Sequence, residues 1–465
     1  MPEQTPGPQL GEQTAAALSE YQLSPYRVPL GLIRAGLMVK HSCANANARL
    51  GYLTADEHAA ITEAIAGLER MSDEELRSEF PIDAWQGGAG TAINMNLNEA
   101  IALRARRAGV MLSPLDHVNR HQSTNDVMPT ALRVMLLLML SELERETERL
   151  QEALQAGEQA HASVLKVART QLRDATVVSA GQQYATWAGA VARDRWRLFK
   201  ARERLKEVNL GGTAVGTGLG APRDYVLQVI QELQQLCPHP VARADNPVEA
   251  TSNYDQLLEA METINIGASN LARIGGDLRL LASGPHGGIG EITLPAAVKG
   301  SSIMPDKTNP VLAEAVVGAC ERIMANHPLL TRLCSRSELE LNAFLPQIAV
   351  TCWESVALLV GATRTLVRFV QSISVDVGRC EANLEASYAS IVAVMPLFGY
   401  RRCERFVREA RAAGVSLTRY LEHNQDMERE DIDTLLSPRN LTRLGYDPEL
   451  YRVLREKYLG TEASP

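Results

Sequence analysis

A long stretch that reads as a single helix constrains the fold of this chain more than any other feature. Residues 126–165 run DVMPTALRVMLLLMLSELERETERLQEALQAGEQAHASVL and contain no glycine before Gly157. A second run of similar character occupies residues 354–373. Helices of this length pack most easily against one another in a bundle. The pattern therefore predicts long helices from about residue 126 to residue 372.

The segment VMLLLML within the first long run is apolar on more than one face of a helix. Such a helix has to be surrounded by partners. One large monomeric bundle would supply them, but association between subunits is the interpretation that we favour, because it buries such faces in a protein of ordinary solubility.

Composition and length agree with a helical protein of several domains. Hydrophobic residues make up 45% of the chain and aromatic residues only 5%, and the aliphatic weight falls on alanine and leucine, which favour helices over sheets. A length of 465 residues exceeds what one core usually serves. We expect an N-terminal helical domain over residues 1–115 with a flexible tail over 1–20, a central bundle over 116–373, and a small C-terminal helical domain over 374–465.

Charge and cysteine usage exclude several classes of protein. The formal net charge is −8 and there is no long basic run, so nucleic acid is not an expected partner. The seven cysteines are odd in number and show no CxxC spacing, which favours reduced thiols in a cytoplasmic protein over a zinc site or a disulfide framework. The N-terminus lacks the pattern of a signal peptide, and no membrane span and no metal site are expected.

Three loops place small hydroxyl or amide side chains directly before a predicted helix. They are GGAGTAINMNLNEAIALRARR (87–107), HQSTNDVMPTALRV (121–134) and GSSIMPDKTNP (300–310). In the third, Asn309 is predicted to cap a helix whose first residue is Pro310. Helix N-termini favour anions, although ordinary capping would explain any one of these loops alone. Together with Lys307, the three loops indicate a site for an anion with two carboxylates, if they converge.

The third loop resembles the signature loop of the fumarase/aspartase superfamily, GSSxMPxKxNP. VNRHQSTNDVMPTA and GGAGTAINMNLNEAIALRA resemble its other two conserved regions, and the similarity extends from about residue 33 to about residue 445. The resemblance implies an all-α, three-domain fold and a homotetramer around a twenty-helix core, with active sites shared by three subunits. It also implies a reversible anti-elimination from a succinyl compound, usually releasing fumarate, with no organic cofactor.

The resemblance assigns roles to residues of the three loops. Ser301 matches the general base that removes a proton from C3 of the substrate; a serine hydroxyl needs nearby N–H groups or a cation for this, and Lys307 would suit. Glu314, one turn into the following helix, matches a supporting acid. The expected donors to the developing aci-carboxylate are Thr91, Ser123, Thr124 and Ser302, and the expected ligands of the other carboxylate are Lys307 and Asn309, with Asn125 nearby.

The leaving group is indicated by a few residues that vary within the superfamily. ARTQLRDAT (168–176) has Gln171 where fumarases carry a histidine, and EATSNYD (249–255) looks more like the aspartase form. A glutamine cannot carry a proton as histidine does, so Thr170 and Gln171 are interpreted as substrate-orienting residues, the alternative being a Gln171 that merely packs in a helix. The resemblance thus favours a carbon–nitrogen lyase close to the aspartases, with fumarase as the alternative.

Other positions depart from the family pattern. SEYQLSPYRVPLGLIRAG (19–36) stands where the family's N-terminal segment with a substrate-binding arginine is expected, and Arg27 or Arg34 could replace that arginine. His121, Gly220 and Asp306 also differ from the usual residues. These changes point to a divergent member, which could act on an N-substituted aspartate. A nucleotide-binding enzyme is rejected, because GTGLGA (216–221) is a weak glycine match with no strand before it.

Overall fold

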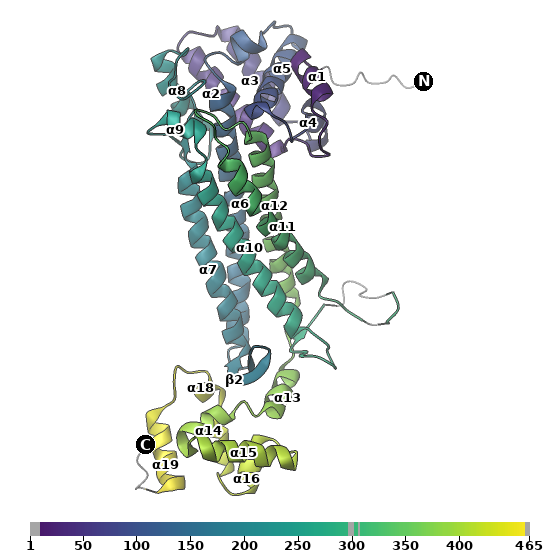
Figure 1. The fold of residues 1–465 in the computed structure, drawn as a ribbon, viewed down its shortest axis with the longest axis vertical. Coiled ribbons are helices and arrows are strands. Elements are labelled where there is room, and N and C mark those ends of the chain that lie inside the picture. Colours follow the sequence, from purple (N-terminus) through teal and green to yellow (C-terminus); the bar gives the residue numbers. More distant parts are fainter. Residues whose placement is uncertain (1–9, 296–301, 306, 461–465) are drawn as a thin grey trace. The chain divides into compact units, whose positions relative to one another are not determined.

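The computed structural model describes residues 10–295, 302–305 and 307–460, so Ser301 and Asp306 lie outside the described residues. The described chain is mainly helical (Figure 1). Contacts between its residues divide it into two compact units. Unit 1 comprises Met1–Thr147, Asp194–Leu271 and Gly318–Thr363, and unit 2 comprises Glu148–Arg193, Ala272–Val317 and Arg364–Pro465.

The five longest helices of the described residues each contain a boundary between the units. They are α6 (Thr124–Ala160), α7 (Ala180–Leu205), α10 (Asp255–Leu281), α11 (Val311–Cys334) and α12 (Leu345–Ser372). The long helices predicted from the sequence are therefore confirmed for both apolar runs. Within the described part of the chain, α12 alone has the length and apolar composition to cross a membrane, and most of it is buried, as in the core helix of a globular protein.

Unit 1 also contains shorter helices and one parallel pair of two-residue strands. These elements are α1 (Glu12–Glu20), α2 (Leu30–Arg49), α3 (Ala55–Glu69), α4 (Asp73–Glu79), η1 (Gly88–Gly90), α5 (Thr91–Arg107), η2 (Pro114–Val118), β3 (Glu207–Val208), α8 (Arg223–Leu236), β4 (Ala242–Arg243) and α9 (Pro247–Ser252).

Helix α2 is the centre of packing in the N-terminal part of unit 1. It contacts α8, α3 and α5, and its buried side chains include Leu32, Ile33 and Leu37. Gly36 lets α5 approach closely, because a Cβ at this position would lie 2.7 Å from Leu97 Cδ1. A capping box starts α3: the Thr54 hydroxyl accepts from the Glu57 N–H and the Glu57 carboxylate accepts from the Thr54 N–H.

Unit 2 contains a β-hairpin, a second short strand pair and a set of short helices. The elements are β1 (Leu165–Thr170), β2 (Arg173–Ser179), β5 (Ile292–Thr293), β6 (Ser374–Val375), α13 (Val377–Ser387), α14 (Ile391–Phe398), α15 (Tyr400–Ala413), α16 (Leu417–His423), α17 (Arg429–Leu435), α18 (Pro438–Leu441) and α19 (Pro448–Leu459). The short helices that the sequence predicts near the C-terminus are confirmed, and their buried core includes Leu397, Phe406, Leu421 and Leu454.

The antiparallel hairpin of β1 and β2 corrects the sequence analysis, which predicted helix throughout this region. The strands alternate buried and exposed residues in part and carry Val167, Val177 and Val178, which favour sheets. The two-residue connection, Gln171 and Leu172, has φ values of 53° and 60°, as hairpin turns of this length require. Local strand propensity and turn geometry therefore outweigh the helical pattern that precedes them.

All seven cysteines are buried, and none forms a disulfide in the part of the chain that the structure describes. Burial raises the pKa of their thiols, in Cys320 and Cys334 to about 12. Thiols with such a pKa are poor nucleophiles at neutral pH, so these residues act as small apolar side chains.

Candidate functional site

The predicted site residues are divided between the two units. Unit 1 carries Thr91, Ser123, Thr124 and Asn125, and unit 2 carries Thr170, Gln171, Ser302, Lys307, Asn309 and Glu314. Each group is described here within its own unit.

The first loop of unit 1 reaches α5 through a series of left-handed residues. Gly88, Ala89 and Gly90 have φ values of 80°, 54° and 91°, a conformation that glycine adopts at little cost. The Ala89 N–H donates to the Ala343 carbonyl at 3.1 Å. Thr91 is the first residue of α5, as predicted; it is exposed, and its hydroxyl donates to the Gly88 carbonyl at 2.8 Å.

The second loop is held by the carboxylate of Asp126, in the first turn of α6. It accepts from the N–H groups of Ser123 at 2.9 Å, Gly211 at 3.0 Å and Thr213 at 3.1 Å. Burial raises the pKa of Asp126 to about 6, although these hydrogen bonds oppose the rise. One buried carboxylate thus ties the loop that carries Ser123 to the glycine-rich segment after residue 209.

Asparagine side chains join the remaining motifs of unit 1. Asn209 donates to the Asn125 carbonyl and to the Thr251 hydroxyl, each at 2.9 Å. Asn94, one turn after Thr91, donates to the Thr124 hydroxyl at 3.3 Å. Four segments that are far apart in the chain therefore meet around residues 124 and 125, two of them from the three predicted loops.

A buried lysine lies behind the second loop. The ammonium of Lys40, on α2, donates to Asn119 Oδ1 at 2.9 Å and to Gln122 Oε1 at 2.8 Å, and its residue is only 1% exposed. Asn119 Oδ1 also accepts from Asn94 and Asn98, each at 3.2 Å. Burial lowers the pKa of Lys40 to about 8. The sequence analysis did not find this residue, because a lone lysine within a helix carries no signal of burial.

Two of the departures from the family pattern have a structural explanation. His121 adopts a left-handed backbone with φ of 61°, and its ring packs between Tyr52 and Tyr225 while Nδ1 bonds the Asn47 amide oxygen at 2.7 Å. Arg34 pairs with Asp73 at 2.8 Å and also donates to backbone carbonyls, so its guanidinium is engaged.

Arg27 is the more accessible of the two arginines proposed to replace the family's substrate-binding residue. It is exposed, and its backbone forms an isolated antiparallel bridge with Asp83. The Asp83 carboxylate fixes the preceding segment by accepting from the Leu23 and Ser24 N–H groups at 2.8 and 2.7 Å. The backbone around Arg27 is therefore held in place while its side chain is free to reach solvent.

In unit 2, the predicted substrate-orienting residues lie at the tip of the hairpin. Thr170 ends β1 and Gln171 occupies the turn, and both are exposed. The alternative that Gln171 merely packs in a helix is wrong, because no helix includes it and its side chain reaches solvent.

The third loop is exposed at Ser302 and Lys307, while Asn309 is partly buried. Helix α11 begins at Val311, one residue later than predicted, so Asn309 and Pro310 both precede it. Glu314 lies in the first turn of α11, as predicted, and its carboxylate is 3.9 Å from the guanidinium of Arg279.

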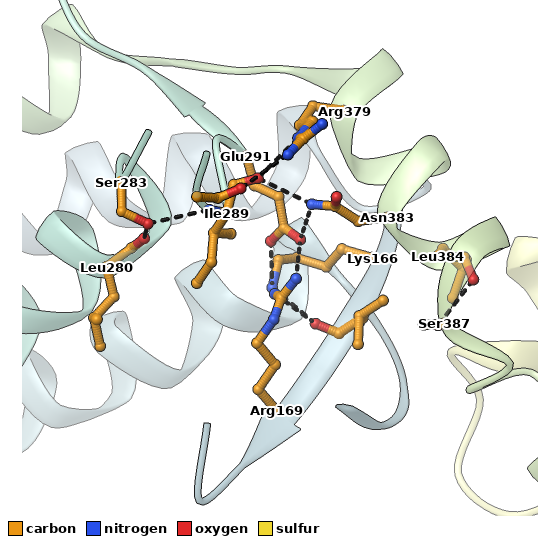
Figure 2. Close-up of polar contacts among 12 residues, drawn as sticks. Lys166, Arg169, Leu280, Ser283, Ile289, Glu291, Arg379, Asn383, Leu384 and Ser387 are labelled. Carbon is orange, nitrogen blue, oxygen red and sulfur yellow. Dashed lines mark hydrogen bonds and ion pairs between the residues drawn. The ribbon is translucent and has the colours of Figure 1, made fainter. Parts of the chain in front are cut away.

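A second buried carboxylate, Glu291, lies beside the base of the hairpin (Figure 2). It contacts Lys166 at 3.0 Å, Arg169 at 2.9 Å and Asn383 at 3.1 Å. Burial alone would raise the pKa of Glu291, but Arg169 and Lys166 hold it below the ordinary value. The sequence analysis missed these residues; the signal present was charge inside short strand-like runs, LKVART and GEITLP.

Among the described residues, no group of three or more histidine, cysteine, aspartate or glutamate side chains is arranged to hold a metal ion. The described site consists of hydroxyls, amides, backbone N–H groups and a few cations. Such groups bind and orient carboxylates by hydrogen bonding.

The chain is similar to several known proteins. The chain matches a family described as lyase over residues 4–325. It is 34% identical to an aspartate ammonia-lyase of Bacillus subtilis (strain 168), covering 94% of this chain and 93% of that protein. It is 35% identical to a class II fumarate hydratase of Myxococcus xanthus (strain DK1622), covering 93% and 94%. A structure of fumarate lyase:delta crystallin from Brucella melitensis bound to cobalt has a TM-score of 0.87 at 36% identity, covering 92% and 95%.

Proposed function

Because the chain belongs to the lyase family, within the fumarase/aspartase superfamily, we propose that it is a carbon–nitrogen lyase. The reaction is the reversible anti-elimination of ammonia, or of a substituted amine, from L-aspartate or a close aspartate derivative to give fumarate. The observation that carries this choice of leaving group is the exposed Gln171 at the tip of the hairpin.

The proposed mechanism begins with Ser301, which lies outside the described residues. Its deprotonated oxygen takes a proton from C3, and the electron pair moves into the adjacent carboxylate to form an aci-carboxylate. Hydrogen-bond donors aimed at that group lower the barrier, because they act where negative charge develops. Those donors are Thr91, Ser123, Thr124 and Ser302. Collapse of the intermediate forms the double bond of fumarate and breaks the C–N bond, so the substrate's ammonium group leaves as neutral ammonia or amine while the C3 proton stays on Ser301.

The second carboxylate of the substrate is bound by Lys307 and Asn309, with Asn125 nearby. In unit 1, the position of Asn125 is fixed by its side-chain bond to the Ala214 carbonyl at 2.8 Å and by Asn209 on its own carbonyl. Glu314 supports this region from the first turn of α11. The proposed function needs the groups of both units to meet in one site.

Fumarase is the second candidate function, and the relative with 35% identity supports it. It would release water instead of an amine from the same kind of intermediate. Gln171 argues against it, because an amide cannot pass a proton to or from a leaving hydroxyl. Thr170 and Gln171 suit the orientation of a substrate by hydrogen bonds.

We further propose that the protein is a cytoplasmic homotetramer with a three-domain subunit, in which each active site combines loops of three subunits. On the described part of α7, Trp196 and Phe199 are 60% and 54% exposed. Large apolar side chains on a long helix are typical of surfaces that associate. Neither nucleic acid nor a membrane is proposed as a partner.

The test follows fumarate by its ultraviolet absorbance. Purified protein is mixed with L-aspartate, with L-malate, and in the reverse direction with fumarate and ammonia. Fumarate from aspartate that disappears in Ser301→Ala supports the proposal, and Ser335→Ala, at the exposed end of α11, is the matched control. Fumarate from malate alone would make the protein a fumarase. A folded tetramer that is silent with both would direct the search to N-substituted aspartates.

A further inference from the structure

Glu291 collects side chains from two other segments of unit 2 (Figure 2). Lys166 and Arg169 come from β1 and Asn383 comes from α13, while Glu291 itself is only 1% exposed. Removing a carboxylate and two cations from water is costly, and well-packed apolar residues often stabilise a fold as well or better. Such a cluster instead fixes the positions of the segments that it joins, here β1, α13 and the segment that carries Glu291.

The hairpin is irregular beside the two cations that reach Glu291. The register of β1 against β2 shifts between Val167 and Arg169, and the extra residue lies in β2, where three steps from Val177 to Asp174 match two steps in β1. Bulges of this kind bend a hairpin and strengthen its twist. Lys166 and Arg169 both contact the Glu291 carboxylate across this irregular part of the hairpin.

Arg169 stands at the base of the hairpin tip. The next two residues, Thr170 and Gln171, are the predicted substrate-orienting pair. The guanidinium of Arg169 also donates to the Val167 carbonyl of the same strand at 3.4 Å. The position of the tip is therefore fixed from its base by the contact between Arg169 and Glu291.

The segment around Glu291 is held by contacts with β6 and α13. Glu291 directly precedes β5, and its carbonyl accepts from the Asp376 N–H at 3.0 Å, beside the pairing of β5 with β6. Arg379 and Asn383 of α13 donate to the carbonyls of Gly288 and Ile289 at 2.8 to 3.1 Å. The hairpin, β5 and α13 are thus joined at the same point.

We propose that Arg169 and Glu291 are positioning residues for the lyase reaction, which hold the hairpin tip that carries Gln171 in place against β5 and α13. This inference rests on the proposed function. Neither residue contacts the substrate; they act through the hairpin tip and through β5. Lys166 pairs with the same carboxylate farther from the tip, so it contributes to stability more than to the placement of Gln171.

The experiment compares Arg169→Gln with Lys166→Gln, since both remove one cation from Glu291. Arg169→Gln should lower kcat/KM for fumarate formation about 100-fold, the size of effect expected when a contact group is displaced by about 1 Å. Lys166→Gln should lower it less than about tenfold at a similar loss of Tm. Arg169→Lys, which keeps the charge, should recover part of the loss. Asp426→Asn, which breaks an ion pair with Arg402 elsewhere in unit 2, is the control.

Two results would overturn the inference. In one, activity falls in parallel with Tm in Arg169→Gln, Lys166→Gln and the control, which would make the cluster a purely structural element. In the other, Arg169→Gln keeps full activity. Wild-type protein is assayed first with both aspartate and malate, so a wild type that is silent with both bears on the proposed substrate and not on the cluster, which is then tested by hydrogen exchange.

The cluster also has a test that needs no activity. Hydrogen exchange in Glu291→Gln should rise in peptides covering residues 165–179 and 283–295 and stay unchanged in α15 and α19. An unchanged exchange at the hairpin would refute the positioning role directly. Should Glu291→Gln fail to fold, Arg169→Gln is measured in the same way, because it leaves the Lys166 contact in place.

Discussion

Replacing the buried lysine of α2 by methionine, Lys40→Met, should remove a specific pH dependence of stability from this protein. The ammonium is enclosed within unit 1 and its pKa falls from 10.5 to about 8, chiefly through burial, while Cys43 and Asp126 oppose the change. The folded protein therefore binds this proton more weakly than the unfolded chain does. The corresponding contribution to the free energy of unfolding is present above pH 10.5 and is lost as the pH falls through 8.

The lowered pKa of Lys40 corresponds to a change of about 3 kcal/mol in the free energy of unfolding between pH 8 and pH 10.5. At neutral pH, Lys40→Met is stabilised because it no longer buries a charged ammonium. This stabilisation is opposed by the loss of the bond to Gln122 Oε1, because a buried oxygen without a partner costs about 1–3 kcal/mol. Asn119 Oδ1 keeps its donors Asn94 and Asn98. The two proteins should therefore have similar stability near pH 7, and wild type should gain about 3 kcal/mol over the variant between pH 8 and 10.5.

The assay is urea denaturation followed by tryptophan fluorescence at a series of pH values. The quantity of interest is the difference in unfolding free energy between wild type and Lys40→Met, since other titrating groups cancel in it. Lys200→Met removes an exposed lysine of α7 and serves as the control. A difference that stays constant from pH 8 to pH 10.5 would refute the reasoning, because it would mean that the ammonium is not held in a desolvated position.

Three further predictions concern the framework of unit 1. Gly216→Ala should lower the free energy of unfolding by about 2–4 kcal/mol, because the φ of 87° is left-handed and a Cβ would lie 2.3 Å from the Pro247 carbonyl oxygen. In thermal unfolding, Gly220→Ala should lower Tm less than Gly216→Ala does, because Gly220 is also left-handed but has open space around it. Burial alone would raise the pKa of Asp83, but its hydrogen bonds outweigh this and lower it. The contribution of the Asp83 carboxylate to the free energy of unfolding is present above pH 3.8 and is lost as the pH falls further. The stabilities of wild type and Asp83→Asn should therefore converge in acid, and a difference in unfolding free energy that persists there would contradict this. Thr54→Ala removes a capping box and should lower the free energy of unfolding by about 1 kcal/mol in chemical denaturation. An unchanged denaturant midpoint would show that α3 does not depend on its cap.

The hydrogen-bond network in unit 1 shows how an amide-rich loop is held by shared acceptors. Asn119 Oδ1 accepts from three donors, and Asp126 accepts from three backbone N–H groups. The amide oxygens of Asn94 and Asn98 are buried without a hydrogen-bond partner among the described residues, so the donor side of these amides, and not the acceptor side, is what the network uses. A site that must present neutral donors to a dicarboxylate benefits from such rigidity, because no reorganisation is then needed during the reaction.

The sequence by itself determined the features that depend on neighbouring residues. The apolar run in residues 126–160 forms α6, and the capping box of Thr54 and Glu57 starts α3. The start of α5 at Thr91 and of α11 just after Pro310 follow from glycine, asparagine and proline at helix ends. Helix periodicity and capping act over three or four residues, so they can be read locally.

The hairpin at residues 165–179 was decided by structure that the local pattern did not reveal. The preceding helix has strong periodicity, while the strand signal is short and its register is interrupted by an extra residue in β2 between Asp174 and Val177. The consequence is large, because Gln171 belongs to an exposed turn and not to a helix. Its interpretation as a substrate-orienting residue thereby gains support from its placement.

Only the tertiary structure identified the residues that support the loops. Three hydrogen bonds join residues that are far apart in the sequence. They connect Lys40 with Gln122, Asp126 with Gly211, and Glu291 with Arg169. Lys40, Asp126 and Glu291 are buried; burial shifts the pKa of Lys40 and Asp126, and the cations beside Glu291 lower its pKa against the effect of burial. A linear sequence shows where a charge stands in a motif, but the fold decides whether water or another side chain surrounds it.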